Sequence, residues 1–153
     1  MATPDLSTLL ITGTDDELLL FTLSRRISNA SNEAQRTFCT VWEAAEFLPS
    51  DGFESLLEQA TPLEEYAAAY ARIGMPQIAP LFDRVLALIP PELRSPEKEE
   101  ARFRHIHGLF EKLKQLLYEY LDSTADLLPT MAQYVREHRS DFTAYFEGPP
   151  PVA

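Results

Sequence analysis

Seven carboxylate side chains and no basic side chain occupy positions 37–71 of the chain. These residues are Glu43, Glu46, Asp51, Glu54, Glu58, Glu64 and Glu65. Carboxylates can act as an acid–base pair in catalysis, can share a metal ion with histidine, or can form a row of negative charge that a basic partner binds. Neighbours such as Glu64 and Glu65 point to different sides of a helix, which disfavours an acid–base pair. We therefore expect these residues to act through their charge.

Part of this acidity has an ordinary structural cause, because carboxylates at the start of a helix interact favourably with the helix dipole. Such positions are predicted for Asp51, Glu54, Glu64 and Glu65. The pairs Glu43/Glu46 and Glu54/Glu58 are like charges three and four residues apart, and each pair costs a helix about 0.2–0.5 kcal/mol. That cost is small, so two interpretations remain open: a solvated face that keeps the protein soluble, or a surface that binds a partner.

The spacing of these acids suits imitation of a nucleic-acid backbone. Four residues of a helix advance roughly 6 Å, which is close to two nucleotide steps of about 3.4 Å each along one DNA strand. Acids spaced in this way can meet a basic groove that evolved to bind DNA. Direct binding to nucleic acid or to an anionic membrane is not expected, because 24 acidic and 13 basic residues give a net charge of −11.

The other candidates for chemistry give no positive evidence for catalysis. The single cysteine, Cys39, lies on an apolar helical stripe, where cysteine is usually a small core residue rather than a nucleophile. His105 and His107 lie about 200° apart around a helix, so they cannot share a metal ion. No glutamate has a histidine three residues later, and the five glycines are scattered singly. We expect a protein that is not an enzyme and needs no metal or other cofactor.

Length and composition indicate one domain. The 153 residues, 45% of them hydrophobic, are enough for one buried core. One cysteine excludes an intrachain disulfide, the N-terminus lacks the basic segment of a secretion signal, and LLLF at 18–21 is too short to span a bilayer. We expect a cytoplasmic protein with a single helical domain over residues 1–147 and a flexible proline-rich tail over residues 148–153.

Apolar residues recur at helical spacing almost throughout, so the expected fold class is all-α, a single compact bundle of about seven helices. The predicted helices cover about residues 14–27, 32–47, 52–60, 61–74, 76–89, 96–121 and 125–138. Thr14, Asp51 and Thr61 are the predicted N-caps of the first, third and fourth helices. Pro49 is expected to stop the second helix, and Gly74 to end the fourth.

The sixth predicted helix is one long helix in the C-terminal half. Its apolar residues repeat at spacings of three and four and form one seam: Phe103, Ile106, Phe110, Leu113, Leu117 and Tyr120. From residue 96 to residue 121 the helix would span roughly 39 Å, comparable to a whole small domain. The seam either lies in the core of a monomeric bundle or packs in part against a second subunit.

Three segments of the chain carry a family likeness. They are TVWEAAEFLPSDGFESLLEQ (40–59), YARIGMPQIAPLFDRVLALIP (70–90) and YVREHRSDF (134–142). Together they resemble a family of small bacterial all-helical proteins typified by an acidic DNA mimic. The family's Asn-Gly-Gly-Phe-x-Gln turn and its Ile-Gly helix end are matched by Gly52, Phe53, Ile73 and Gly74. The chain departs from that turn at Ser50, Asp51 and Ser55.

The resemblance implies a dimeric protein that occupies the DNA-binding face of a transcriptional repressor and so relieves repression. Our leading hypothesis is accordingly an acidic, non-enzymatic interaction protein whose partner is a basic DNA-binding protein, bound through the seven acids. An immunity or antitoxin-like protein that neutralises a cationic toxin would use the same charge complementarity. A third alternative is a member of the family without DNA mimicry, because surface acids do not follow from a fold-level match.

Overall fold

The computed structural model describes residues 15–58 and 61–146, which form helices joined by turns and contain no β-strand. The α-helices are α2 (Asp16–Arg26), α3 (Glu33–Leu57), α4 (Leu63–Arg72), α5 (Ala79–Ala87), α6 (Glu99–His107), α7 (Phe110–Ser123), α8 (Leu127–Glu137) and α9 (Thr143–Phe146). Three short 3₁₀ helices are η1 (Pro91–Leu93), η2 (Pro96–Lys98) and η3 (Arg139–Phe142). The predicted all-α class is confirmed, with a helix number close to the expected seven.

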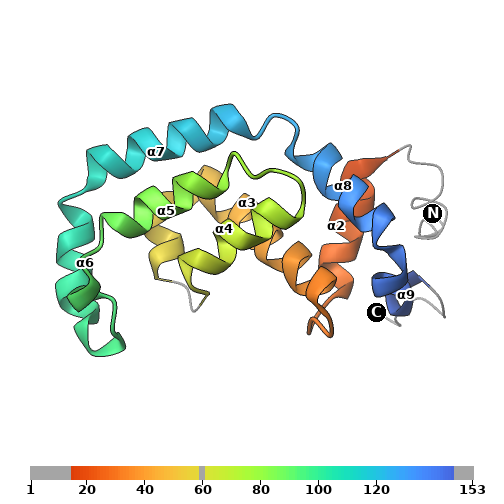
Figure 1. Ribbon diagram of the computed structural model, residues 1–153, viewed down its shortest axis with the longest axis horizontal. Helices are drawn as coiled ribbons and strands as arrows, with labels where there is room; N and C mark the ends of the chain where they lie inside the picture. The colour runs from red at the N-terminus through yellow and green to blue at the C-terminus, as the bar shows by residue number, and fades with distance from the viewer. Residues whose placement is uncertain (1–14, 59–60, 147–153) are drawn as a thin grey trace.

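The helices are arranged around α3 and α4. Figure 1 shows α7 along one long edge of the molecule, α4 and α5 beside α3, and α2, α8 and α9 together at one end. The helix α3 packs against α4 and α7, α4 packs against α5, and α2 packs against α8. At the other end α6 packs chiefly against η1 and η2. None of the described helices is both long enough and apolar enough to cross a membrane.

An aromatic cluster joins four helices in the core. Phe82 of α5 lies at its centre, with its ring centroid 5.8 Å from that of Phe53, 5.7 Å from Tyr66 and 5.3 Å from Tyr70. Tyr120 of α7 packs edge-on against both Phe53 and Tyr70. All five side chains are buried, so α3, α4, α5 and α7 are held together by a large apolar area with favourable edge-to-face geometry.

The predicted helix end at Pro49 is wrong, because α3 continues to Leu57. Pro49 lacks the N–H that would have donated to the carbonyl of Ala45, and its ring crowds that carbonyl, which weakens the helix here without ending it. The direction changes three residues later, at Gly52, where φ is 74° and ψ is −177°. Gly52 interrupts the helical backbone, so the predicted third helix is the part of α3 beyond this kink.

Two of the predicted N-caps have to be reassigned. Thr14 lies outside the described residues, and the cap of α2 is Asp15, whose Oδ1 accepts a hydrogen bond from the backbone N–H of Leu18 at 3.0 Å. The helix α4 begins after Pro62 without any side-chain cap, so Thr61 does not have the predicted role. The proline fixes the chain direction instead.

The next turn and helix agree well with the sequence. Gly74 adopts φ 99° and lets the backbone N–H of Met75 donate to the carbonyl of Tyr70 at 2.9 Å, which ends α4 as predicted. The helix α5 is shorter than the predicted 76–89, because residues 76–78 form a turn. The predicted inward stripe is buried: Ile78, Phe82, Val85 and Ile89.

The single long helix expected over 96–121 is wrong, because the structure divides it into η2, α6 and α7. The division falls at Gly108, whose N–H donates to the carbonyls of Arg104 and His105. On one side α6 packs against η1 and η2, and on the other α7 packs against α3 and α5, so the two halves have different neighbours. The seam is split accordingly: Ile106, Leu113 and Tyr120 are buried, whereas Phe103 is 59% and Phe110 57% exposed.

The C-terminal elements η3 and α9 were not predicted. Phe142 of η3 is fully buried and packs edge-on against Phe38 of α3, with ring centroids 6.2 Å apart. The side-chain amides of Asn32 and Gln35 both donate to the backbone carbonyl of Asp141, at 2.8 and 2.7 Å. The start of α3 therefore holds the end of the described chain in place. The tail predicted over residues 148–153 lies outside the described residues.

Candidate acidic interaction surface

The seven predicted acids all lie on α3, on α4 or in the turn between them. Five are exposed, namely Glu46, Asp51, Glu58, Glu64 and Glu65. Glu43 and Glu54 are half-buried. None of the seven forms an ion pair with a basic side chain in the part of the chain that the structure describes. Their charge is thus uncompensated by direct contacts, which leaves it available to a partner.

Six arginine side chains of the described residues contact groups other than the seven candidate acids. Arg72 pairs with Glu33 at 3.2 Å, Arg84 with Glu119 at 3.0 Å, Arg136 with Asp16 at 2.7 Å, and Arg104 with Glu100. Arg94 donates to the carbonyls of Leu86 and Ile89, and Arg102 to those of Leu93 and Ser95. These contacts stabilise the junctions between helices, and none of them involves one of the seven candidate acids.

The charges of Glu43 and Glu65 both act on the hydroxyl of Tyr66. Burial raises the pKa of the Tyr66 hydroxyl most, and the charges of Glu43 and Glu65 raise it further. The Thr61 hydroxyl also lies 3.5 Å from Oε2 of Glu43. The middle of α3 and the first turn of α4 therefore form one acidic neighbourhood, although these residues lie about twenty positions apart in the sequence.

Glu43 and Glu46 line an open groove between α2 and α3. Its other lining residues are Ser24, Ile27, Ser28, Phe38, Cys39 and Trp42. The indole N–H of Trp42 donates to Oε1 of Glu46 at 2.8 Å, which holds that carboxylate against the ring. No basic residue is among those that line this groove.

Glu54 lies at the kink of α3. Its Oε2 is 2.5 Å from the place that a Cβ on Gly52 would occupy, so the carboxylate folds back over the glycine. A side chain at position 52 would meet this carboxylate in addition to the strain of a positive φ. Glu54 thus has a local structural environment of its own, distinct from the groove at Glu46.

Glu58 contributes to a second groove, which it shares with residues of α6. The lining comprises Glu58, Glu99, Glu100, Arg102, Phe103 and Ile106. Glu64 lies in the neighbouring groove, near Arg94 and Arg102. Glu99 and Glu100 were missed as candidate residues, because nothing in their local pattern places them beside the end of α3.

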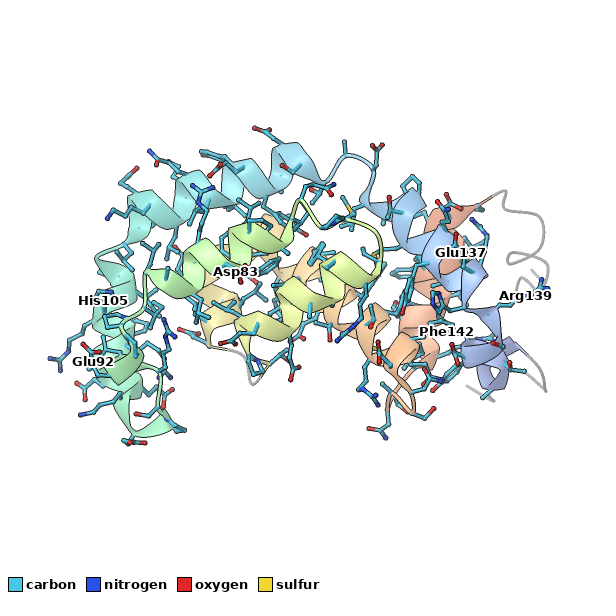
Figure 2. The ribbon with its side chains drawn as sticks, in the orientation of Figure 1. Asp83, Glu92, His105, Glu137, Arg139 and Phe142 are labelled. Atoms are coloured by element: carbon cyan, nitrogen blue, oxygen red, sulfur yellow. The ribbon has the colours of Figure 1, made fainter. Side chains whose placement is uncertain are left out.

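Cys39 and His105 lie in surroundings that do not favour catalysis or metal binding. Burial, and then the charge of Glu43, raise the pKa of the Cys39 thiol, which keeps it protonated and poorly nucleophilic. His105 of α6 lies at the end of the molecule shown in Figure 2, and its Nε2 is 2.8 Å from the carbonyl of Leu88. Among the residues that the structure describes, no three His, Cys, Asp or Glu side chains come together as a metal site.

The residues that carried the family likeness hold the fold. Gly52 and Gly74 have positive φ angles, and Phe53, Ile73 and Phe142 are buried. No curated protein and no solved structure matches the chain. The model of the DMP19-like protein family matches residues 29–138, which include every described helix from α3 to α8. The chain belongs to the DMP19-like protein family.

Proposed function

We propose that this protein is a non-enzymatic DNA mimic that occupies the DNA-binding face of a basic protein, such as a transcriptional regulator, in the cytoplasm. The observation that carries the proposal is the set of seven candidate acids at positions 43–65, none of which is paired with a basic side chain among the described residues. Membership of a family typified by an acidic DNA mimic supports the same function.

The seven carboxylates lie on packed helices or on the turn between them. Each carboxylate is carried by a helix or by the turn between two packed helices, so the charges keep their spacing when a partner approaches. A basic surface that binds DNA gains affinity by replacing counterions on phosphates, and a fixed array of carboxylates competes for the same side chains. Binding of this kind weakens as salt concentration rises.

The test is capture of a basic DNA-binding protein, followed by competition with duplex DNA. In a triple variant, Glu46→Gln, Glu58→Gln and Glu65→Gln, affinity should fall about tenfold or more at low salt, since three exposed charges are lost. The matched control removes three exposed acids from η1, α7 and α8: Glu92→Gln, Asp122→Asn and Glu137→Gln. The control should bind like the wild type.

The same experiment separates the alternatives. A captured partner that duplex DNA does not displace, and that is a cationic toxin, would replace DNA mimicry by an immunity function. Equal losses in the two triple variants would show that net charge alone matters, and the proposed surface on α3 and α4 would then be wrong.

We further propose that the protein is a homodimer that uses the outer face of α7. Phe110, Tyr118 and Leu121 are exposed on this helix, at 57%, 53% and 40%. The ammonium group of Lys114 lies 5.9 Å from the ring centroids of both Phe110 and Tyr118, so these side chains share one face. Phe110→Ser should convert a dimer to a monomer in sedimentation analysis, whereas Phe21→Ser on α2 should not.

A further inference from the structure

The groove between α2 and α3 combines an apolar floor with an acidic rim. Ile27, Phe38 and Trp42 supply the apolar surface, and Glu43 and Glu46 supply two negative charges. Phe38 and Trp42 are stacked with ring centroids 5.9 Å apart. A row of carboxylates that only imitated phosphates would not need an aromatic ring beside it. This composition therefore indicates recognition of a particular side chain of the partner.

The acidic rim is held in position before any partner arrives. The indole N–H of Trp42 occupies Oε1 of Glu46, which leaves Oε2 to accept another hydrogen bond. Glu43 is half-buried and lies beside the Thr61 hydroxyl of the neighbouring helix turn. A cation that enters the groove therefore meets the Glu46 carboxylate, already held against Trp42, at little cost in side-chain entropy, with Glu43 as a second lining acid.

The basic residues at the end of α2 do not fill this groove. The guanidinium group of Arg25 lies over the ring of Phe21, 4.3 Å from its centroid. Arg26 donates from Nη1 to the carbonyl of Tyr145 at 3.0 Å. Both basic residues nearest in sequence to the groove thus have other contacts, and the pair Arg25–Phe21 shows the same kind of cation–aromatic contact on the adjacent helix.

We propose that this groove is a socket for an arginine side chain of the basic partner, with the guanidinium plane against Trp42 and its N–H groups directed at Glu43 and Glu46. The inference rests on the proposed function, because the partner is the same basic protein, and it adds which residue of that protein is recognised. The apolar floor would accommodate the methylene stem of the arginine.

Arginine fits this groove better than lysine for three physical reasons. Its guanidinium group is planar and stacks on aromatic rings, of which tryptophan binds cations best. Its five N–H donors can serve two carboxylates at once, whereas an ammonium group acts as a compact point charge. Its weaker hydration also lowers the cost of approaching an apolar surface.

Trp42 provides the test, because it is the only tryptophan in the chain and gives one indole cross-peak in a proton–nitrogen correlation spectrum. The intact protein is titrated with the peptide amide acetyl-Gly-Arg-Gly and with its lysine counterpart. The arginine peptide should shift the indole cross-peak and bind about two- to fivefold more tightly than the lysine peptide. Glu46→Gln should reduce that affinity by a similar factor, and Glu111→Gln on α7 should not change it.

Each outcome decides the inference. Equal affinities for the two peptides, an unshifted indole cross-peak, or equal effects of Glu46→Gln and Glu111→Gln would overturn the socket. Trp42→Leu, checked for native helix content by circular dichroism, should abolish the preference for arginine. If DNA still displaces a captured partner while the peptides show no preference, the socket fails and the DNA-mimic function stands. If the peptides bind as expected but DNA displaces no partner, the socket stands and the DNA-mimic function fails.

Discussion

The hydroxyl groups of Tyr70 in α4 and Tyr120 in α7 lie 2.5 Å apart inside the aromatic core, where both side chains are buried. One hydroxyl donates to the other, so each polar group removed from water is compensated by its neighbour. This contact joins the helix that carries Glu64 and Glu65 to the helix proposed to form the dimer face. It links the stability of the fold to the geometry of both surfaces.

Replacing one tyrosine of this pair should lower the free energy of unfolding more than replacing both. Tyr120→Phe leaves the Tyr70 hydroxyl buried without its partner, and we expect the free energy of unfolding in urea to fall by about 1–3 kcal/mol. The double variant Tyr70→Phe/Tyr120→Phe should recover much of this loss, because no hydroxyl then lacks a partner. A double variant less stable than both single variants would contradict the hydrogen-bond interpretation.

The same pair predicts how stability depends on alkaline pH. Burial raises the pKa of Tyr120 from the ordinary 10.0 to about 12, and burial also raises the pKa of Tyr70. The folded protein therefore keeps protons that the unfolded chain loses, so stability is fully present below about pH 10 and decreases as pH rises toward 12. Urea unfolding at a series of pH values should show this decrease, to which Tyr120 alone contributes about 2–3 kcal/mol. Tyr120→Phe should make the decrease of stability with pH shallower. An unchanged slope would contradict the contribution of the Tyr120 hydroxyl.

Gln35 should control the attachment of the C-terminal segment. Its side chain is buried, donates to the Asp141 carbonyl and accepts from both the backbone N–H and the hydroxyl of Ser31. Gln35→Ala removes these contacts, so we expect about 1–3 kcal/mol less stability and faster hydrogen exchange in residues 139–146. Gln115→Ala, at an exposed position of α7, is the matched control and should change neither measurement.

Gly52 and Gly108 should respond differently to alanine. Gly52 has φ 74° and faces the Glu54 carboxylate, so Gly52→Ala should destabilise the fold by about 1–2 kcal/mol or more. Gly108 has φ −72°, and a Cβ there would come no closer than 3.4 Å to the His105 carbonyl. Gly108→Ala should therefore be neutral or stabilise by up to about 1 kcal/mol. Thermal unfolding of both variants compares them directly, and equal losses would refute the argument from backbone geometry.

The candidate surface shows where sequence reasoning succeeds and where it stops. The acids of positions 37–71 could be named from composition alone, and the absence of basic residues among them is visible in the sequence. That no distant arginine pairs with them among the described residues depended on where Arg72 and Arg84 lie in space. The groove at Trp42 needed α2 and α3 side by side, which no local pattern predicts.

Some helix boundaries were also predictable from the sequence, and others were not. The stripe of α5 and the end of α4 at Gly74 were predictable, because apolar periodicity and a glycine with positive φ are properties of neighbouring residues. The break between α6 and α7 was not predictable from periodicity, since the apolar repeat runs through Gly108 without interruption. The two halves part because they have different packing partners.

The sequence by itself determined the all-helical class, the family and the local excess of negative charge, because these depend on composition and on residues within a few positions of one another. Only the tertiary structure decided that Pro49 lies within a helix, that Phe142 completes the core, and which carboxylates share a groove. Those features depend on contacts between residues far apart in the chain, and their free energies are set by packing and burial rather than by local preference.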